Sequence, residues 1–288
     1  MSGTHGMLMR MRDVQRDAVL QFLDAHPVDG ILARESVANV SQASKRVFQH
    51  YLPVLGWQDS WSGELDGVVF LGWNLFPVGL PDEALNRAAA YVASTFTRLG
   101  SIVGVQDQVL QLWDALQGRL GSAREIRSNQ YCLVIDRPPL VQPDARLRKA
   151  HPWEDMFVLP AAIAMFREEM GYDPTTRSAA GFIARTSKYA AEGRTYIVTD
   201  PNEPTRVIFK ADVGALSQEC AQLQGVWTDP EFRGRGIARH ALAGVVQDLL
   251  TQVPRVSLYV NSFNTRARAV YDVVGFREYG RWASVLVS

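Results

Sequence analysis

Residues 226–240, VWTDPEFRGRGIARH, are the stretch that most restricts how this 288-residue chain can fold. They follow an extended apolar run and lead into a helical pattern, so we predict a strand, a tight turn and a helix start. Gly234 and Gly236 keep side chains out of the turn, and the first N–H groups of a helix have no partner within it. The helix dipole favours an anion there, and Arg233 and Arg235 add positive charge. We therefore predict a cradle for a phosphate or pyrophosphate.

The composition excludes several classes of protein. Lys and Arg number 30, Asp and Glu also number 30, and the net charge is zero, which argues against a general nucleic-acid or membrane-surface binder. No apolar run has the roughly 18–20 residues that span a bilayer. Cys132 and Cys220 form neither a disulfide framework nor a Cys/His metal spacing. We expect a cytoplasmic protein without a metal, and its oligomeric state stays open.

A proline-rich segment at 137–143, RPPLVQP, is the best linker candidate, because proline interrupts helices and central strands. It predicts two domains, residues 1–140 and 146–288. Strands and helices alternate in both, which indicates an α/β architecture. In the first domain we expect helices over 13–25, 82–99 and from 107, and strands over 68–71, 101–104 and 131–135. In the second we expect helices over 153–170, 234–251 and from 264, and strands over 195–199, 206–210, 219–227 and 256–260.

A second motif lies downstream at residues 264–276, NTRARAVYDVVGF. Asn264 is a typical helix N-cap residue, and Gly275 is a typical helix end. Ala267 and Tyr271 are four residues apart and therefore share one helix face. A small residue at 267 permits close approach of a ligand, and a phenol follows one turn later.

Together the two motifs resemble those of the GCN5-related N-acetyltransferase (GNAT) family. Residues 233–238 are similar to its pyrophosphate motif, Gln/Arg-x-x-Gly-x-Gly/Ala, and residues 264–276 to its Asn-x-x-Ala-x-x-x-Tyr-x-x-x-Gly-Phe segment. The resemblance covers roughly residues 146–288 and implies a mixed, mostly antiparallel sheet flanked by helices. The first domain resembles the degenerate acetyltransferase-like domain of actinobacterial two-domain members, on segments 101–104 and 110–113. Two such domains in tandem are implied, and only the second has the cradle.

The resemblance also implies an activity: direct transfer of an acetyl group from acetyl-CoA to an amine. Tyr271 would protonate the leaving thiolate, and an N–H near Val226 or Trp227 would polarise the thioester carbonyl. Arg266 and Arg268 would either reach the 3′-phosphate of CoA or form a solvated face. The implied cofactor-binding residues are Val226, Trp227 and Thr228 for pantetheine, Arg233, Gly234, Arg235, Gly236, Ile237 and Ala238 for the pyrophosphate, and Asn264, Ala267 and Tyr271 on the later helix.

The general base and the acceptor stay open. Strand alternation places Cys220, Gln222 and Gln224 on the face where relatives carry a catalytic Glu or His. A water held by Gln222 or Gln224 is one candidate for the base, and Glu168 or Glu169 is another. The acceptor is either a small-molecule amine or an amine of a peptide or protein. The missing strand carboxylate favours an alternative function, a non-catalytic acyl-CoA-binding regulatory module.

Overall fold

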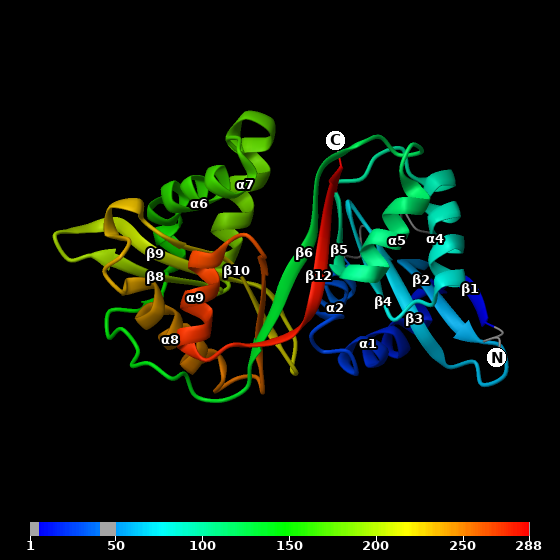
Figure 1. Cartoon of the computed structure of the whole chain (residues 1–288), viewed down its shortest axis with the longest axis horizontal. Helices are drawn as coiled ribbons and strands as arrows, with labels where there is room; N and C mark the ends of the chain where they lie inside the picture. The colour runs from blue at the N-terminus through cyan, green and yellow to red at the C-terminus, as the bar shows by residue number, and fades with distance from the viewer. Residues whose placement is uncertain (1–5, 41–49, 288) are drawn as a thin grey trace. The chain divides into compact units, whose positions relative to one another are not determined.

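The computed structural model describes residues 6–40 and 50–287, and the chain forms two compact units (Figure 1). The first unit contains Met1–Cys132, Tyr259–Phe263 and Glu278–Ser288; the second contains Leu133–Leu258 and Asn264–Arg277. These units differ from the predicted domains, residues 1–140 and 146–288, because two late segments of the chain belong to the first unit. The compact units are therefore not the two continuous segments that the sequence predicts. The division into domains at residues 140–146 stays a prediction.

The first unit is a sheet with helices against it. Its strand order is β1-β2-β3-β4-β5-β12-β6. The strands are β1 (Gly6–Arg12), β2 (Tyr51–Asp59), β3 (Leu65–Leu71), β4 (Asn74–Val78), β5 (Ser101–Val105), β6 (Ala123–Ile135) and β12 (Arg277–Val287). The helices are η1 (Asp13–Gln15), α1 (Arg16–Asp24), α2 (Ile31–Ala38), α4 (Asp82–Thr95) and α5 (Gln106–Leu116). The fully buried Leu75, Ile102 and Val285 bring β4, β5 and β12 into one apolar core.

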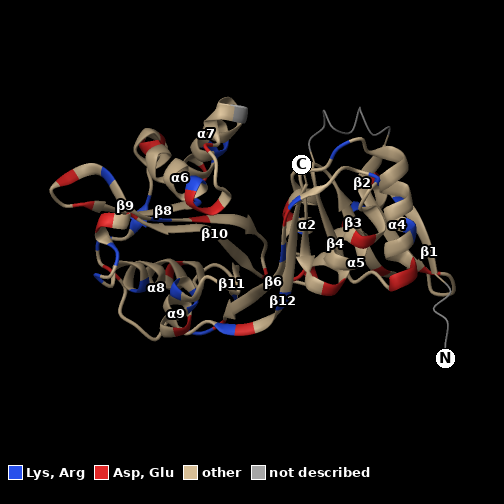
Figure 2. Cartoon of the chain, turned by 45° about the horizontal axis from the view of Figure 1, so that its top comes forward, with Lys and Arg blue, Asp and Glu red and all other residues tan. Residues whose placement is uncertain are grey.

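Along the chain, the second unit has the same succession of elements as the first: a strand, helices, three strands, a helix, a strand and a helix. Its strands run β11-β10-β9-β8-β7, with α6 and α7 over one face and α8 and α9 over the other (Figures 1 and 2). The strands are β7 (Arg148–Lys149), β8 (Thr195–Asp200), β9 (Glu203–Leu216), β10 (Ala221–Thr228) and β11 (Val256–Asn261). The helices are η2 (Pro152–Glu154), α6 (Asp155–Met170), α7 (Thr175–Ala191), η3 (Pro230–Phe232), α8 (Ile237–Leu249) and α9 (Thr265–Val274).

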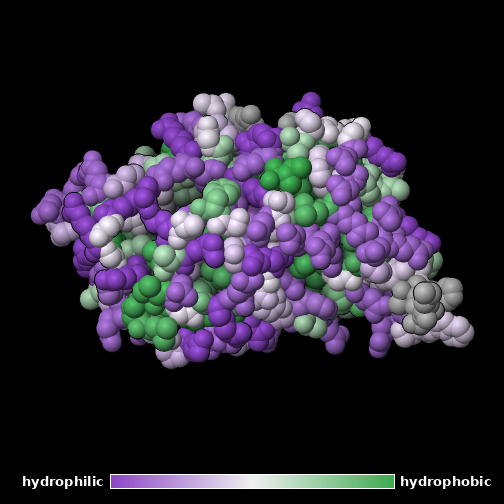
Figure 3. All heavy atoms as spheres, in the orientation of Figure 1, coloured by the Kyte–Doolittle hydropathy of each residue, from purple (hydrophilic) through white to green (hydrophobic). Residues whose placement is uncertain are grey.

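The surface is mixed in charge and polarity. Basic and acidic residues are interspersed along the ribbon of both units (Figure 2), and on the face drawn in Figure 3 hydrophilic residues separate small hydrophobic patches. None of the helices formed by the described residues is long and apolar enough to cross a membrane.

Several helix boundaries differ from their predictions by a few residues, among them those of α4 and α8. The helix predicted over 82–99 ends at Thr95, and Pro81 is its N-cap, so Asp82 lies in the first turn and complements the helix dipole. The helix predicted from residue 234 begins only at Ile237. Gly234 and Gly236 both have left-handed backbone, with φ of 76° and 79°, and a right-handed helix cannot include them. The glycines thus form the turn rather than the first helical turn.

Candidate functional site

Strand β10 carries a bulge halfway along its length. Gln224 pairs with Asp212 and Trp227 pairs with Lys210, so Gly225 and Val226 lie opposite the single residue between those partners. Gly225 has φ of 57°, which a glycine adopts without strain. A bulge bends its strand and leaves the extra residue outside the ladder. The bulge therefore leaves one extra residue between Gln224 and Trp227 outside the ladder, and the pairing with β9 resumes at Trp227 with Lys210 and Thr228 with Phe209.

The opposite edge of β10 opens at the same level. β10 pairs with β11 in parallel at Ala221 with Val256 and Gln222 with Ser257, and the pairing ends there. The remainder of β10, up to Thr228, leads into the glycine turn before α8. We call the point after Gln222, where β10 and β11 stop pairing, the strand fork. Strand backbone beyond this fork is available to an extended ligand that pairs like an added strand.

The turn after β10 places the N-terminus of α8 in the same groove as the part of β10 beyond the strand fork. Asp229 caps the short η3 helix by accepting a hydrogen bond from the Glu231 N–H at 3.0 Å. The turn then passes through Gly234 and Gly236 before α8 begins. A Cβ added at Gly234 would meet no atom within 4 Å, so its left-handed backbone, and not crowding, makes glycine suitable there. The exposed turn and the free first amides of α8 suit an anion.

Helix α9 forms the facing wall. The Asn264 side chain accepts a hydrogen bond from the Ala267 N–H at 3.2 Å, and Gly275 ends the helix with φ of 109°, as predicted. Tyr271 is only 7% exposed and packs edge-on against Phe276. Burial, together with Glu169, raises the pKa of Tyr271, so its hydroxyl stays protonated at neutral pH. A protonated phenol at this place is a proton donor.

These elements enclose one groove of about 1030 Å³. It is lined by Glu168 and by every predicted cofactor-binding residue: Val226, Trp227, Thr228, Arg233, Gly234, Arg235, Gly236, Ile237, Ala238, Asn264, Ala267 and Tyr271. The structure thus brings together two motifs that are far apart in sequence. Arg266 also lines the groove, together with Phe232, Arg239 and Val270, which are outside the predicted set of binding residues. Of these, Arg239 had a usable signal, because it follows the cradle within the first helical turn.

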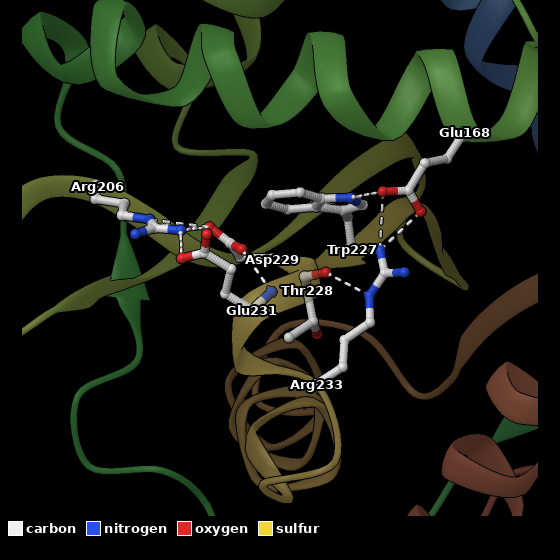
Figure 4. A network of polar contacts seen from close by, with 7 residues as sticks. All are labelled: Glu168, Arg206, Trp227, Thr228, Asp229, Glu231 and Arg233. Carbon is white, nitrogen blue, oxygen red and sulfur yellow. Dashed lines mark hydrogen bonds and ion pairs between the residues drawn. The ribbon is translucent and has the colours of Figure 1, made fainter.

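A polar network braces one wall of the groove (Figure 4). The Arg233 guanidinium donates to the Thr228 carbonyl at 2.9 Å and to both Glu168 carboxylate oxygens at 2.9 and 2.7 Å. The Trp227 indole N–H donates to the same carboxylate at 3.1 Å. Glu168 therefore ties α6 to β10. Three hydrogen bonds already occupy this carboxylate, which weighs against Glu168 as the base, and the Arg233 guanidinium is engaged by protein acceptors.

A second ion-pair cluster holds the segment before the cradle. Arg206 on β9 donates to Asp229 at 3.0 and 2.8 Å and to Glu231 at 2.6 Å (Figure 4). Phe232 lies beside this cluster, with the Arg206 and Arg235 guanidinium carbons 5.1 and 5.0 Å from its ring centre. The cluster fixes residues 229–232, which lie directly before the glycine turn, and Arg235 is an exposed residue of the groove lining.

The glutamines of β10 lie outside the groove. Gln224 donates to the Tyr189 hydroxyl at 3.0 Å, so α7 holds its amide. Gln222 is 2% exposed, and its side-chain nitrogen has no hydrogen-bond partner among the described residues. Burial raises the pKa of the Cys220 thiol to about 11, and it stays protonated at neutral pH. The assignment of Glu168 and Gln224 as catalytic residues stays a prediction.

A forked sheet, a glycine turn at a helix N-terminus and a capped helix thus meet around one groove in a unit of the α/β class. Residues 164–276 match the model of the acetyltransferase (GNAT) family, so the C-terminal half contains a GNAT acetyltransferase domain. Residues 53–156 match a domain of unknown function, DUF4081. The predicted family resemblance of the C-terminal half is thereby confirmed.

Known proteins are similar to this chain in sequence and in structure. Over 84 residues, or 29% of this chain, the sequence is 32% identical to peptidyl-lysine N-acetyltransferase YjaB of Salmonella typhimurium, and it spans 50% of that protein's length. A solved Drosophila protein has a TM-score of 0.62 at 12% identity, covering 97% of this chain and 98% of its own. A tandem GNAT protein from the clavulanic acid biosynthesis pathway has a TM-score of 0.53 at 12% identity, covering 98% of both chains. These two structures support the tandem fold alone.

Proposed function

We propose that the second unit binds acetyl-CoA in the groove between β10, α8 and α9 and transfers the acetyl group to an amine. One observation carries the proposal: the strand fork, the left-handed glycine turn and the Asn264-capped helix line a single groove of about 1030 Å³. Each feature recognises a different part of one cofactor.

Successive parts of the cofactor are assigned to successive segments of the protein chain. The pantetheine arm pairs with the backbone of residues 226–228 as an added strand. The pyrophosphate accepts hydrogen bonds from the amides of residues 234–238 at the start of α8. Tyr271 protonates the departing thiolate, and its raised pKa keeps the proton available at neutral pH. The N–H of Val226 polarises the thioester carbonyl, so that the amine attacks a more electrophilic carbon.

The first unit contributes no second cofactor site in this proposal. Its equivalent turn, before α4, contains Leu80 and Pro81. Proline has no N–H, and the Leu80 N–H donates to the Gln108 side chain at 3.4 Å. Two amides of this turn are therefore absent or used, and Asp82 and Glu83 place two carboxylates in the first turn of α4, where they would repel a phosphate.

The acceptor is proposed to be a primary amine. The Salmonella relative is named a peptidyl-lysine N-acetyltransferase, which favours a lysine side chain over a small-molecule amine. A second candidate function, a non-catalytic acyl-CoA-binding regulatory module, is favoured by the contacts that occupy Glu168 and Gln224. It predicts CoA binding without turnover.

Release of free thiol distinguishes the two functions. Acetyl-CoA is incubated with the full chain and a panel of amines and lysine peptides, and the thiol is measured. We expect amine-dependent release that Tyr271→Phe reduces. Calorimetry with CoA is run beside it and should give one site per chain. Binding without release for any acceptor would favour the regulatory module, and no binding would overturn both functions.

A further inference from the structure

Lys210 on β9 is a fully buried cation in the second unit. Its side chain is 0% exposed, and its Nζ lies 2.6 Å from Asp212 Oδ2 and 3.2 Å from the Gly225 carbonyl oxygen. Removing two charges from water is expensive, and apolar replacements for buried ion pairs are often equally stable. A contribution to the stability of the folded chain is therefore a weak explanation for a buried Lys210 ammonium.

The ion pair lies directly beneath the bulge of β10. Lys210 and Asp212 are the two β9 residues that pair with Trp227 and Gln224, on either side of the bulge. The second Asp212 oxygen accepts a hydrogen bond from the Thr195 hydroxyl at 2.8 Å. Thr195, Asp212, Lys210 and the Gly225 carbonyl thus form a continuous hydrogen-bonded chain across three strands.

The packing around Gly225 leaves this peptide little freedom. A Cβ built on Gly225 would lie 3.0 Å from Met165 Cε, 3.1 Å from Lys210 Nζ and 3.3 Å from Asp212 Oδ2. The ammonium therefore supplies the partner that the Gly225 carbonyl loses when it leaves the ladder. It also determines which way that carbonyl points.

The orientation of the carbonyl determines that of the next amide. No described peptide bond is cis, and in a planar trans peptide the C=O and the N–H point in opposite directions. Because the Gly225 carbonyl points at Lys210, the N–H of Val226 points away from Lys210. Val226 lines the groove. A cation hydrogen-bonded to the carbonyl also polarises the peptide and makes its N–H a stronger donor.

The geometry points to Lys210 as a positioning residue: with Asp212, it holds and polarises the Gly225–Val226 peptide so that the Val226 N–H donates to the thioester carbonyl of acyl-CoA. The inference rests on the proposed function. Lys210 touches neither the cofactor nor the acceptor, and it acts only through this peptide.

Infrared difference spectroscopy tests the inference without a known acceptor. The full chain is loaded with acetyl-CoA carrying ¹³C at the thioester carbonyl, and the carbonyl stretch of the bound ligand is recorded. A hydrogen bond from an N–H lowers this frequency. In Lys210→Met, which keeps length and removes charge, we expect the frequency to rise towards that of free acetyl-CoA. The calorimetric affinity for CoA, which has no acetyl group, should stay within about two-fold. Once an acceptor is known, kcat should fall by about 10–100-fold, less than the ~10²–10³-fold loss of a whole oxyanion donor.

Two further variants keep the test decisive. Tyr196→Phe removes the hydrogen bond from Tyr196 to Asp248 at 2.5 Å, next along β8 from Thr195, and should leave the carbonyl frequency unchanged. If Lys210→Met does not fold, Lys210→Met combined with Asp212→Leu replaces both charges together, a change that is often neutral for folding. An unchanged frequency in a Lys210 variant that binds acetyl-CoA overturns the inference alone. Failure of the parent protein to bind acetyl-CoA overturns the proposed function and, with it, the inference.

Discussion

Replacement of Gly236 by valine should separate cofactor binding from folding. Gly236 is the N-cap of α8 and has φ of 79°. An L-residue in this left-handed region costs roughly 1–2 kcal/mol, and a β-branched side chain is especially unfavourable there. An added Cβ would also meet the Arg239 guanidinium at 3.3 Å, although this flexible side chain can move. The turn should therefore relax away from the conformation that presents its amides.

The expected loss of affinity follows from that strain. If CoA must restore the strained turn on binding, the roughly 1–2 kcal/mol appears as about 5–30-fold weaker affinity. Calorimetric titration measures the effect directly. Pantetheine, which lacks the pyrophosphate, should bind the parent and the Gly236→Val protein equally well. This comparison assigns the loss to the phosphate-binding turn.

Gly193→Val is the matched control. Gly193 lies in the same unit, has φ of 66° and does not line the groove. Both variants should lower the melting temperature by a few degrees, since both introduce similar strain. Only Gly236→Val should weaken CoA binding. Equal CoA affinity in the parent and Gly236→Val proteins, with the melting temperature lowered, would refute the assignment of this turn to the pyrophosphate.

Three further variants test the site and the core. Tyr271→Phe should lower kcat by ~10²–10⁴-fold with little change in KM for acetyl-CoA, and steady-state rates that stay within a few-fold would make Tyr271 structural. Because burial raises the Tyr271 pKa, its contribution to stability is present below about pH 10 and lost above it, so melting temperatures of the Phe variant should fall less steeply at alkaline pH. Glu168→Gln removes an ion pair with partly exposed partners and should raise KM for acetyl-CoA only a few-fold; loss of the acidic limb of the kcat profile would instead identify Glu168 as the base. Trp282→Ala empties a site that is 1% exposed and should destabilise the first unit by about 3–5 kcal/mol in denaturant titrations.

The parts of the site that sequence alone predicts are those governed by local backbone physics. Gly234, Gly236 and Gly275 all have positive φ, and Asn264 caps its helix, because each conformation depends on a few neighbouring residues. Four of the strands described in the second unit, β8 to β11, overlap their predicted ranges, whereas the two-residue β7 was not predicted. Apolar runs bounded by turn residues identify such strands without any knowledge of their neighbours.

The parts that sequence did not predict depend on distant partners. The bulge at Gly225 is defined by the register between β9 and β10, which a single-strand pattern does not contain. Lys210 reads as an ordinary strand residue until its carbonyl partner is known. The contact of Glu168 with Arg233 joins residues 65 positions apart. The pairing of β12 with β5, far earlier in the chain, likewise depends on residues that no local pattern of β12 contains.

The placement of β12 sets an order of events during synthesis. Ala283 pairs with Gly104 and Val285 with Ile102, and β12 lies between β5 and β6 in the first unit's sheet. A ribosome usually releases domains that fold from the N-terminal end first. Here residues 1–132 emerge early but lack a central strand until residues 277–287 leave the exit tunnel. The body of the second unit, residues 133–258, is complete before that moment. The nascent first unit must therefore wait with β5 and β6 unjoined, and a stalled or truncated chain would expose those strand edges to chaperones and proteases.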